Sequence, residues 1–158
     1  MTTFTAIHVL FSLIGIASGL VVLFGLITAD AMARSTLIFV VTTLATSVTG
    51  FFFPFHGFTP ALALGIVSVI ILIAVILARY RFRLSGGWRW VYVVSAVAAL
   101  YLNSFVLVVQ AFLKIPSLHA LAPKGSEPPF AVAQAFVLIF YVVTGAIAAK
   151  RFRPSSLG

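Results

Sequence analysis

The chain has 158 residues and a formal net charge of +8 at pH 7, and 63% of its residues are hydrophobic whereas 8% are charged. Average soluble domains are about 45–50% apolar and about 25% charged, so we expect one all-α polytopic membrane domain spanning 1–158. No solvated domain remains that would carry the basic residues to nucleic acid, and the absence of cysteine excludes disulfides and thiol catalysis.

The apolar stretch at about 4–27 predicts the first membrane-spanning helix, since about 20 apolar residues cross the hydrocarbon layer. The alternative is a cleaved signal peptide, because residues 29–31 read Ala-Asp-Ala. The stretch lacks a basic beginning and is longer than the apolar part of a signal peptide. We therefore expect this helix to be retained.

Two stretches at about 36–55 and 60–79 predict a hairpin of two further spanning helices, because no aspartate, glutamate, lysine or arginine falls between Ser35 and Ala78. Serine and threonine recur along the first of these helices. In a membrane helix their hydroxyls bond to the preceding turn or to a neighbouring helix, so we expect a role in packing. The alternative is a polar lining for a channel or substrate path.

Small and hydroxyl-bearing residues mark the faces on which we expect the helices to pack. Gly15 and Gly19 form a G-x-x-x-G pair, a spacing that lets two helices approach closely in lipid. The full set of predicted packing residues is Ser12, Gly15, Gly19, Thr46, Gly50 and Gly145.

The stretch at about 88–113 predicts a fourth spanning helix and carries strongly polar residues at membrane depth. An amide that faced lipid would cost several kcal/mol, so we expect the polar face of this helix to look into the bundle. That face comprises Tyr92, Ala96, Ala99, Asn103 and Gln110.

The fifth predicted spanning helix, at about 130–149, places Gln134, Tyr141 and Gly145 on one face. The outer loop at 114–129 precedes it and contains four prolines, which exclude a long helix there but leave room for one turn at 117–121. Loops of this length in compact bundles are often functional, for example as lids.

The basic residues indicate the orientation of the chain. Once five spans are counted, eight of the ten fall on one side, which predicts an outer N-terminus and an inner C-terminus. Four spans with a cleaved first segment is the alternative. We expect the inner basic residues to contact anionic lipid headgroups; they are Arg79, Arg81, Arg83, Arg89, Lys150, Arg151 and Arg153.

Polar and aromatic side chains in the outer half of the bundle form the candidate ligand pocket, namely His8, Asn103, Gln110, His119, Gln134 and Tyr141. Histidine is a common ligand of metals and of haem iron, so His8, His56 and His119 are the candidates for a metal or a b-type haem. A quinone or a lipid is the other candidate occupant. No firm metal site is predicted, since no two of the histidines share a helix.

Catalysis is not expected, and no catalytic residue is predicted. The chain's two acidic residues, Asp30 and Glu127, fall on opposite sides of the membrane in this topology. A carboxylate pair for acid–base hydrolysis and a Ser-His-Asp triad therefore cannot form.

Four stretches resemble a group of small bacterial inner-membrane proteins that have no established activity. They read SLIGIASGLVVLFG, FFFPF, WRWVYVV and QAFLKIPSLHALAPKGSEPPFAVAQ. The resemblance covers nearly the whole chain and implies one domain in a bacterial cytoplasmic membrane. It implies no role for any residue.

These observations favour a small accessory, scaffold or lipid-interacting membrane component that works through helix–helix contacts, as a homo-oligomer or within a larger complex. Two alternatives stay open. One is a redox or cofactor-binding subunit with an outer pocket, and the other is a small channel or transporter.

Overall fold

The computed structural model describes residues 3–54, 57 and 59–153. Within these ranges every regular element is helical, as the predicted all-α class requires. In chain order the elements are α1 (Thr3–Thr28), α2 (Ala33–Gly50), α3 (Pro60–Ile76), the π-helical turn η1 (Leu77–Arg81), α4 (Trp88–Lys114), α5 (Pro116–Leu121) and α6 (Pro128–Arg151).

Prolines begin three of the helices. At the start of α3, the side chain of Thr59 accepts a hydrogen bond from the backbone N–H of Leu62, which caps the helix directly before Pro60. The predicted turn in the outer loop is present as α5, which begins at Pro116. The fixed φ of proline suits the first turn of a helix, where its missing N–H would have no partner.

The second helix differs from its predicted range of 36–55, because α2 begins at Ala33 and ends at Gly50. A turn follows before Pro54. Proline at position 54 disfavours the helical conformation at Phe53, so the helix cannot readily continue to residue 55. Its end at Gly50 coincides with a glycine, which is a weak helix former. The last predicted residue, Phe55, lies outside the described residues.

Four helices are long and apolar enough to cross a membrane in the described part of the chain: α1, Pro60–Arg81 (α3 continued by η1), α4 and α6. α2 is not among them, because Arg34 and several serines and threonines lower its mean hydropathy. The structure thus supports four candidate spans, and the role of α2 as a fifth stays a prediction.

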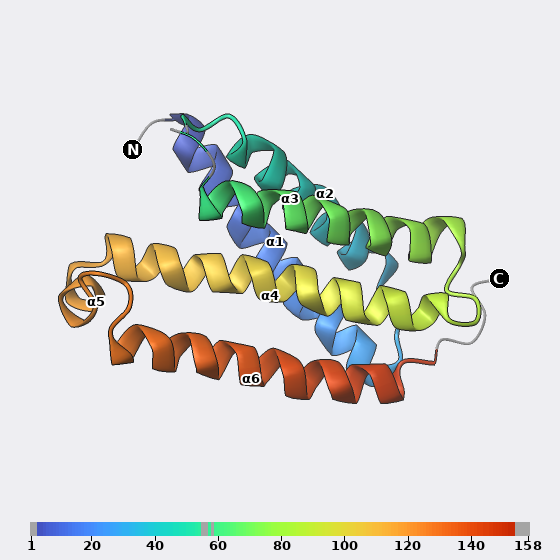
Figure 1. Ribbon diagram of the computed structural model, residues 1–158. Coiled ribbons are helices and arrows are strands. Elements are labelled where there is room, and N and C mark those ends of the chain that lie inside the picture. Colours follow the sequence, from blue (N-terminus) through green and yellow to red (C-terminus); the bar gives the residue numbers. More distant parts are fainter. Residues whose placement is uncertain (1–2, 55–56, 58, 154–158) are drawn as a thin grey trace.

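The helices form two layers (Figure 1). α3, α4 and α6 lie side by side, and the α1–α2 pair crosses behind them obliquely. One end of the bundle holds the start of α1, the end of α2, α5 and the start of α6. The opposite end, which we call the basic end, holds the α1–α2 connection, η1 and the end of α6.

The glycines of α1 bring the two layers together. A Cβ atom added at Gly19 would lie 2.6 Å from Leu100 Cδ1 and 2.9 Å from the ring of Phe39. At Gly15, the nearest atom would be Thr43 Oγ1 at 3.1 Å. The close approach predicted from the G-x-x-x-G spacing therefore occurs inside one chain, between α1 and both α2 and α4.

The remaining predicted packing residues lie in different surroundings. At Gly145 of α6, an added Cβ would lie 3.1 Å from Val97 of α4, which is a close helix contact. At Gly50 it would lie 3.7 Å from His8, an ordinary contact that needs no glycine. Ser12 and Thr46 are half-buried.

Candidate functional site

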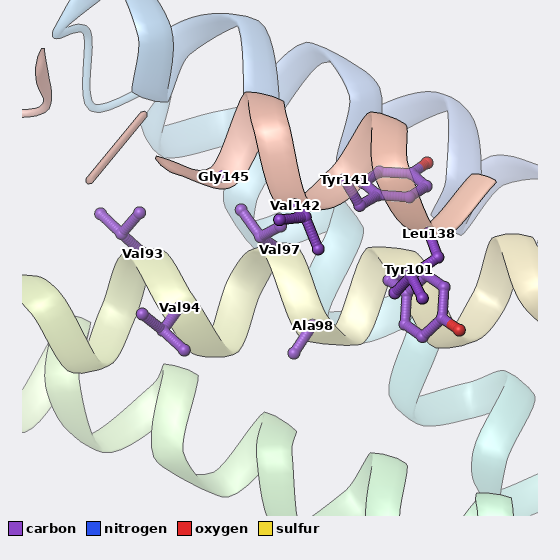
Figure 2. A pocket seen from close by; sticks show the side chains of 9 residues that line it. All are labelled: Val93, Val94, Val97, Ala98, Tyr101, Leu138, Tyr141, Val142 and Gly145. Carbon is purple, nitrogen blue, oxygen red and sulfur yellow. The ribbon is translucent and has the colours of Figure 1, made fainter. Parts of the chain in front are cut away.

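A groove of about 250 Å³ lies between α4 and α6 (Figure 2). It opens on the outer surface of the bundle, since Val94 is 61% and Val142 60% exposed on its two walls. Apart from two tyrosine hydroxyls, its side chains present only carbon atoms. The lining residues are Val93, Val94, Val97, Ala98, Tyr101, Leu138, Tyr141, Val142 and Gly145.

Polar contacts join α4 to α6 along this groove. The hydroxyl of Tyr141 lies 2.7 Å from that of Ser104, and both side chains are buried. Further along α6, Gln134 Nε2 donates to the carbonyl of Phe105 over 3.2 Å. Gln134 Oε1 is buried and has no hydrogen-bond partner, so this acceptor is free to receive a donor.

A second polar contact joins the two layers of the bundle. Asn103 Nδ2 of α4 donates to Thr43 Oγ1 of α2 over 3.1 Å, and both residues are buried. Gly15 of α1 lies directly against this pair. The inward face predicted for the fourth helix is therefore correct for Asn103, whose amide finds its partner inside the bundle.

Gln110 does not lie on the buried face of α4 that contains Asn103, because its side chain is exposed. Seven residues advance a helix by about 700°, so the buried face has drifted by about 20° between Asn103 and Gln110. Gln110 also lies near the end of α4, where a long amide reaches the polar boundary of a membrane. Gln110 therefore does not share the buried face of α4 that the sequence pattern assigned to it, and its place in the candidate outer pocket stays a prediction.

The threonines and serines of α2 mostly bond to their own helix. Thr42, Thr46 and Ser47 donate to the carbonyls four residues earlier, over 2.7–3.0 Å. Their single hydroxyl protons are thus used locally, as is common in membrane helices. This arrangement favours packing over a polar path.

The two histidines that the structure describes have different partners. His8 Nδ1 lies 2.9 Å from Thr49 Oγ1, and its ring meets Phe53 edge-on at 5.1 Å. His119 lies on α5, exposed, with Nδ1 3.3 Å from the carbonyl of Phe112. His56 lies outside the described residues. Among the residues that the structure describes, no group of three histidines or carboxylates could hold a metal.

The hydrogen bonds of the candidate outer-pocket residues do not join these residues to one another: His8, Asn103, His119, Gln134 and Tyr141 each bond to a residue outside the set. Of the candidate set, Tyr141 also lines the α4–α6 groove. The residues that sequence reasoning missed there are valines, Ala98 and Leu138, since an apolar groove between two apolar helices leaves no polar pattern to detect.

Two of the predicted headgroup-binding arginines also have partners within the protein. Arg89 Nη1 donates to the carbonyls of Ala149 and Phe152 at the end of α6, where cations are favoured by the helix dipole. Arg79 is 4% exposed, unlike the other basic residues of η1 and of the loop that follows it. The other five are exposed, namely Arg81, Arg83, Lys150, Arg151 and Arg153.

Arg79 belongs to a chain of hydrogen bonds at the basic end. Its Nη1 donates to the hydroxyl oxygen of Tyr92 over 3.2 Å, and the Tyr92 oxygen lies 3.0 Å from Thr36 Oγ1. Thr36 donates its only hydroxyl proton to the carbonyl of Ala31 over 3.4 Å, so Tyr92 is the donor to Thr36. The chain links η1, α4 and α2.

The loop before α6 is organised by Glu127, whose carboxylate accepts from the backbone N–H groups of Lys124 and Ser126 over 3.0 Å each. Desolvation works in the opposite direction, but these backbone hydrogen bonds prevail and lower the pKa of Glu127 below its ordinary value. The same two hydrogen bonds hold the turn together.

Fold and site together define a helical bundle with four candidate membrane spans, an apolar lateral groove and a basic end. Comparisons of the chain with protein families, with curated proteins and with solved structures found no match. The function of the chain must therefore be inferred from its own residues.

Proposed function

We propose that the chain is a five-span membrane protein of a bacterial cytoplasmic membrane that acts as a small lipid-interacting accessory or scaffold component. The observation that carries this proposal is the α4–α6 groove, which is apolar and opens sideways on the surface that would face lipid. Its occupant is an acyl chain of a membrane lipid, because the lining offers carbon contacts along two helices and few polar groups.

The fifth span in this proposal is α2. It packs along α1 and returns to the end of the bundle from which α1 starts (Figure 1). Its 18 residues measure about 27 Å at 1.5 Å per residue, close to the ~30 Å hydrocarbon thickness. Its hydroxyls mostly bond within the helix, so its lower hydropathy does not leave many polar groups to be satisfied by lipid.

Cysteine labelling tests this topology, since the natural chain has no cysteine. We expect Thr3→Cys and Ser126→Cys to react with a membrane-impermeant maleimide in intact cells, and Ser85→Cys only after permeabilisation. All three positions are exposed. If α2 does not cross, Thr3 and Ser126 will lie on opposite sides, and that result would reject five spans.

Filling the groove tests the lipid interaction. Ala98 lies on its α4 wall (Figure 2), so Ala98→Phe is expected to displace part of a bound acyl chain. Each lost carbon–carbon contact removes about 0.1–0.2 kcal/mol, so a handful of contacts predicts about a threefold drop in retained lipid. The measurement is native mass spectrometry of the protein released from nanodiscs.

Ala146→Phe is the matched control, because Ala146 is an exposed residue of α6 that does not line the groove. It adds the same side chain to the same kind of surface and should leave lipid retention unchanged. An equal loss in both variants, or wild-type protein that retains no lipid, would contradict the proposed function.

A further inference from the structure

The guanidinium of Arg79 is a buried positive charge that has no carboxylate partner among the described residues. The side chain is 4% exposed, and the chain contains only two acidic residues. Both bond elsewhere: Asp30 accepts from the N–H of Met32, and Glu127 accepts from the N–H groups of its own loop. Burying a charge costs free energy unless an opposite charge is close to it, so a bound anion would stabilise this arginine.

The structure compensates this charge only in part. The hydroxyl oxygen of Tyr92 accepts one N–H, and the guanidinium carbon lies 5.3 Å from the centre of the Tyr92 ring and 5.9 Å from that of Tyr80. Such ring contacts favour a cation but do not neutralise it. A guanidinium has five N–H donors, and the structure provides an acceptor for one of them.

The remaining donors are not sealed inside the bundle. Among the described residues, a buried side-chain nitrogen or oxygen without a hydrogen-bond partner occurs only at Gln134. The Arg79 nitrogens that lack a partner must therefore be reachable from the surface. The π-helical turn η1 buries the consecutive residues Ala78 and Arg79, whereas Tyr80 and Arg81 are exposed. The side chain thus reaches inward while its free edge stays accessible at the basic end.

The position of Arg79 fits a phosphate group. The candidate span Pro60–Arg81 ends two residues later, which is about 3 Å along a helix, so Arg79 lies close to the depth at which lipid phosphates begin. Exposed Arg81, Arg83 and Lys150 at the same end attract anions toward it. A guanidinium edge binds phosphate oxygens in a planar, often bidentate manner.

We propose that Arg79 is the core of an anion site at the basic end of the bundle, where its free guanidinium edge binds the phosphate of an anionic phospholipid or a free phosphate ion. Tyr92 and Thr36 position the arginine through their hydrogen bonds. The proposal deepens the proposed lipid interaction and rests on it for the membrane setting. It uses other residues, so Ala98→Phe should leave it intact.

The test is a titration of the purified wild-type protein in neutral detergent with phosphatidylglycerol and, separately, with phosphatidylcholine, followed by native mass spectrometry. We expect one phosphatidylglycerol to bind about tenfold more tightly than phosphatidylcholine, because the choline cation of phosphatidylcholine offsets the charge of its phosphate, whereas phosphatidylglycerol keeps a net negative charge. Arg79→Gln should abolish this preference. Arg81→Gln is the matched control and should keep it within about twofold, because Arg81 is an exposed surface charge.

Competition with inorganic phosphate distinguishes the two sources of the phosphate group. If inorganic phosphate displaces phosphatidylglycerol, the site binds both free phosphate and the phosphate of a lipid. If it does not displace the lipid, the site binds only the lipid phosphate. Wild-type protein without a preference and without phosphate binding would overturn the proposal, as would equal losses in Arg79→Gln and Arg81→Gln. If Arg79→Gln does not fold, Arg79→Lys replaces it, since it keeps the charge and should lose the preference in part.

Discussion

Gly19→Leu is expected to destabilise the bundle by about 3 kcal/mol, the upper range for overpacking a well-packed core. Even its first side-chain atom would lie 2.6 Å from Leu100 and 2.9 Å from the Phe39 ring. Both neighbours are fully buried, so neither can swing into open space. Unfolding by SDS titration in mixed micelles measures the change.

A matched pair of smaller substitutions tests whether the close contact at Gly19 causes this loss of stability. Gly19→Ala adds one methyl group at the close contact and should still destabilise, whereas Gly50→Ala adds the same group where the nearest atom would be 3.7 Å away. Alanine is the better helix former, by roughly 0.5–1 kcal/mol, so Gly50→Ala should be neutral or stabilising. Equal effects at both positions would show that α1 does not pack as described.

Tyr92→Phe is expected to cost about 2 kcal/mol, the range for a hydrogen bond to a charged group. The substitution removes the oxygen that accepts from Arg79 and the hydroxyl that donates to Thr36. It keeps the ring, which packs against Phe152 with centroids 5.8 Å apart. The loss therefore reports the hydrogen bonds and not the packing, and SDS titration again provides the measurement.

A double-mutant cycle assigns that loss to the arginine. In an Arg79→Met background the charge is absent, so Tyr92→Phe should cost only about 1 kcal/mol, for the contact with Thr36. The difference of about 1 kcal/mol is the coupling between Arg79 and Tyr92. Costs that add to within about 0.5 kcal/mol would mean that the two groups do not interact energetically.

Several features of the fold could be predicted because they depend on local chemistry. The ranges of α1, α4 and α6 agree with the apolar stretches within a few residues, since hydrocarbon-length helices have a strong hydropathy signal. Pro116 and Pro60 mark helix starts, as their fixed φ requires. The burial of Asn103 is a consequence of the cost of an amide in lipid.

The candidate site could be predicted much less well. Gln134, His8 and His119 have different partners, although the predicted topology puts all of them in the outer half of the bundle. The predicted side of the membrane gives the position of a residue along the membrane normal. It does not say which residues of different helices are in contact. The sequence groups Arg79 with the other basic residues of one end and does not indicate its burial, because a π-helical turn has no recognisable sequence pattern.

The amino-acid sequence by itself determined that the chain forms apolar helices of membrane length, with most of its positive charge expected at one end, because hydropathy and charge are properties of single residues and short segments. Only the tertiary structure decided which helix faces form the α4–α6 groove and which arginine is buried against Tyr92. These depend on side-chain packing between helices distant in sequence, where differences of a few ångströms and of a fraction of a helical turn separate a buried group from an exposed one.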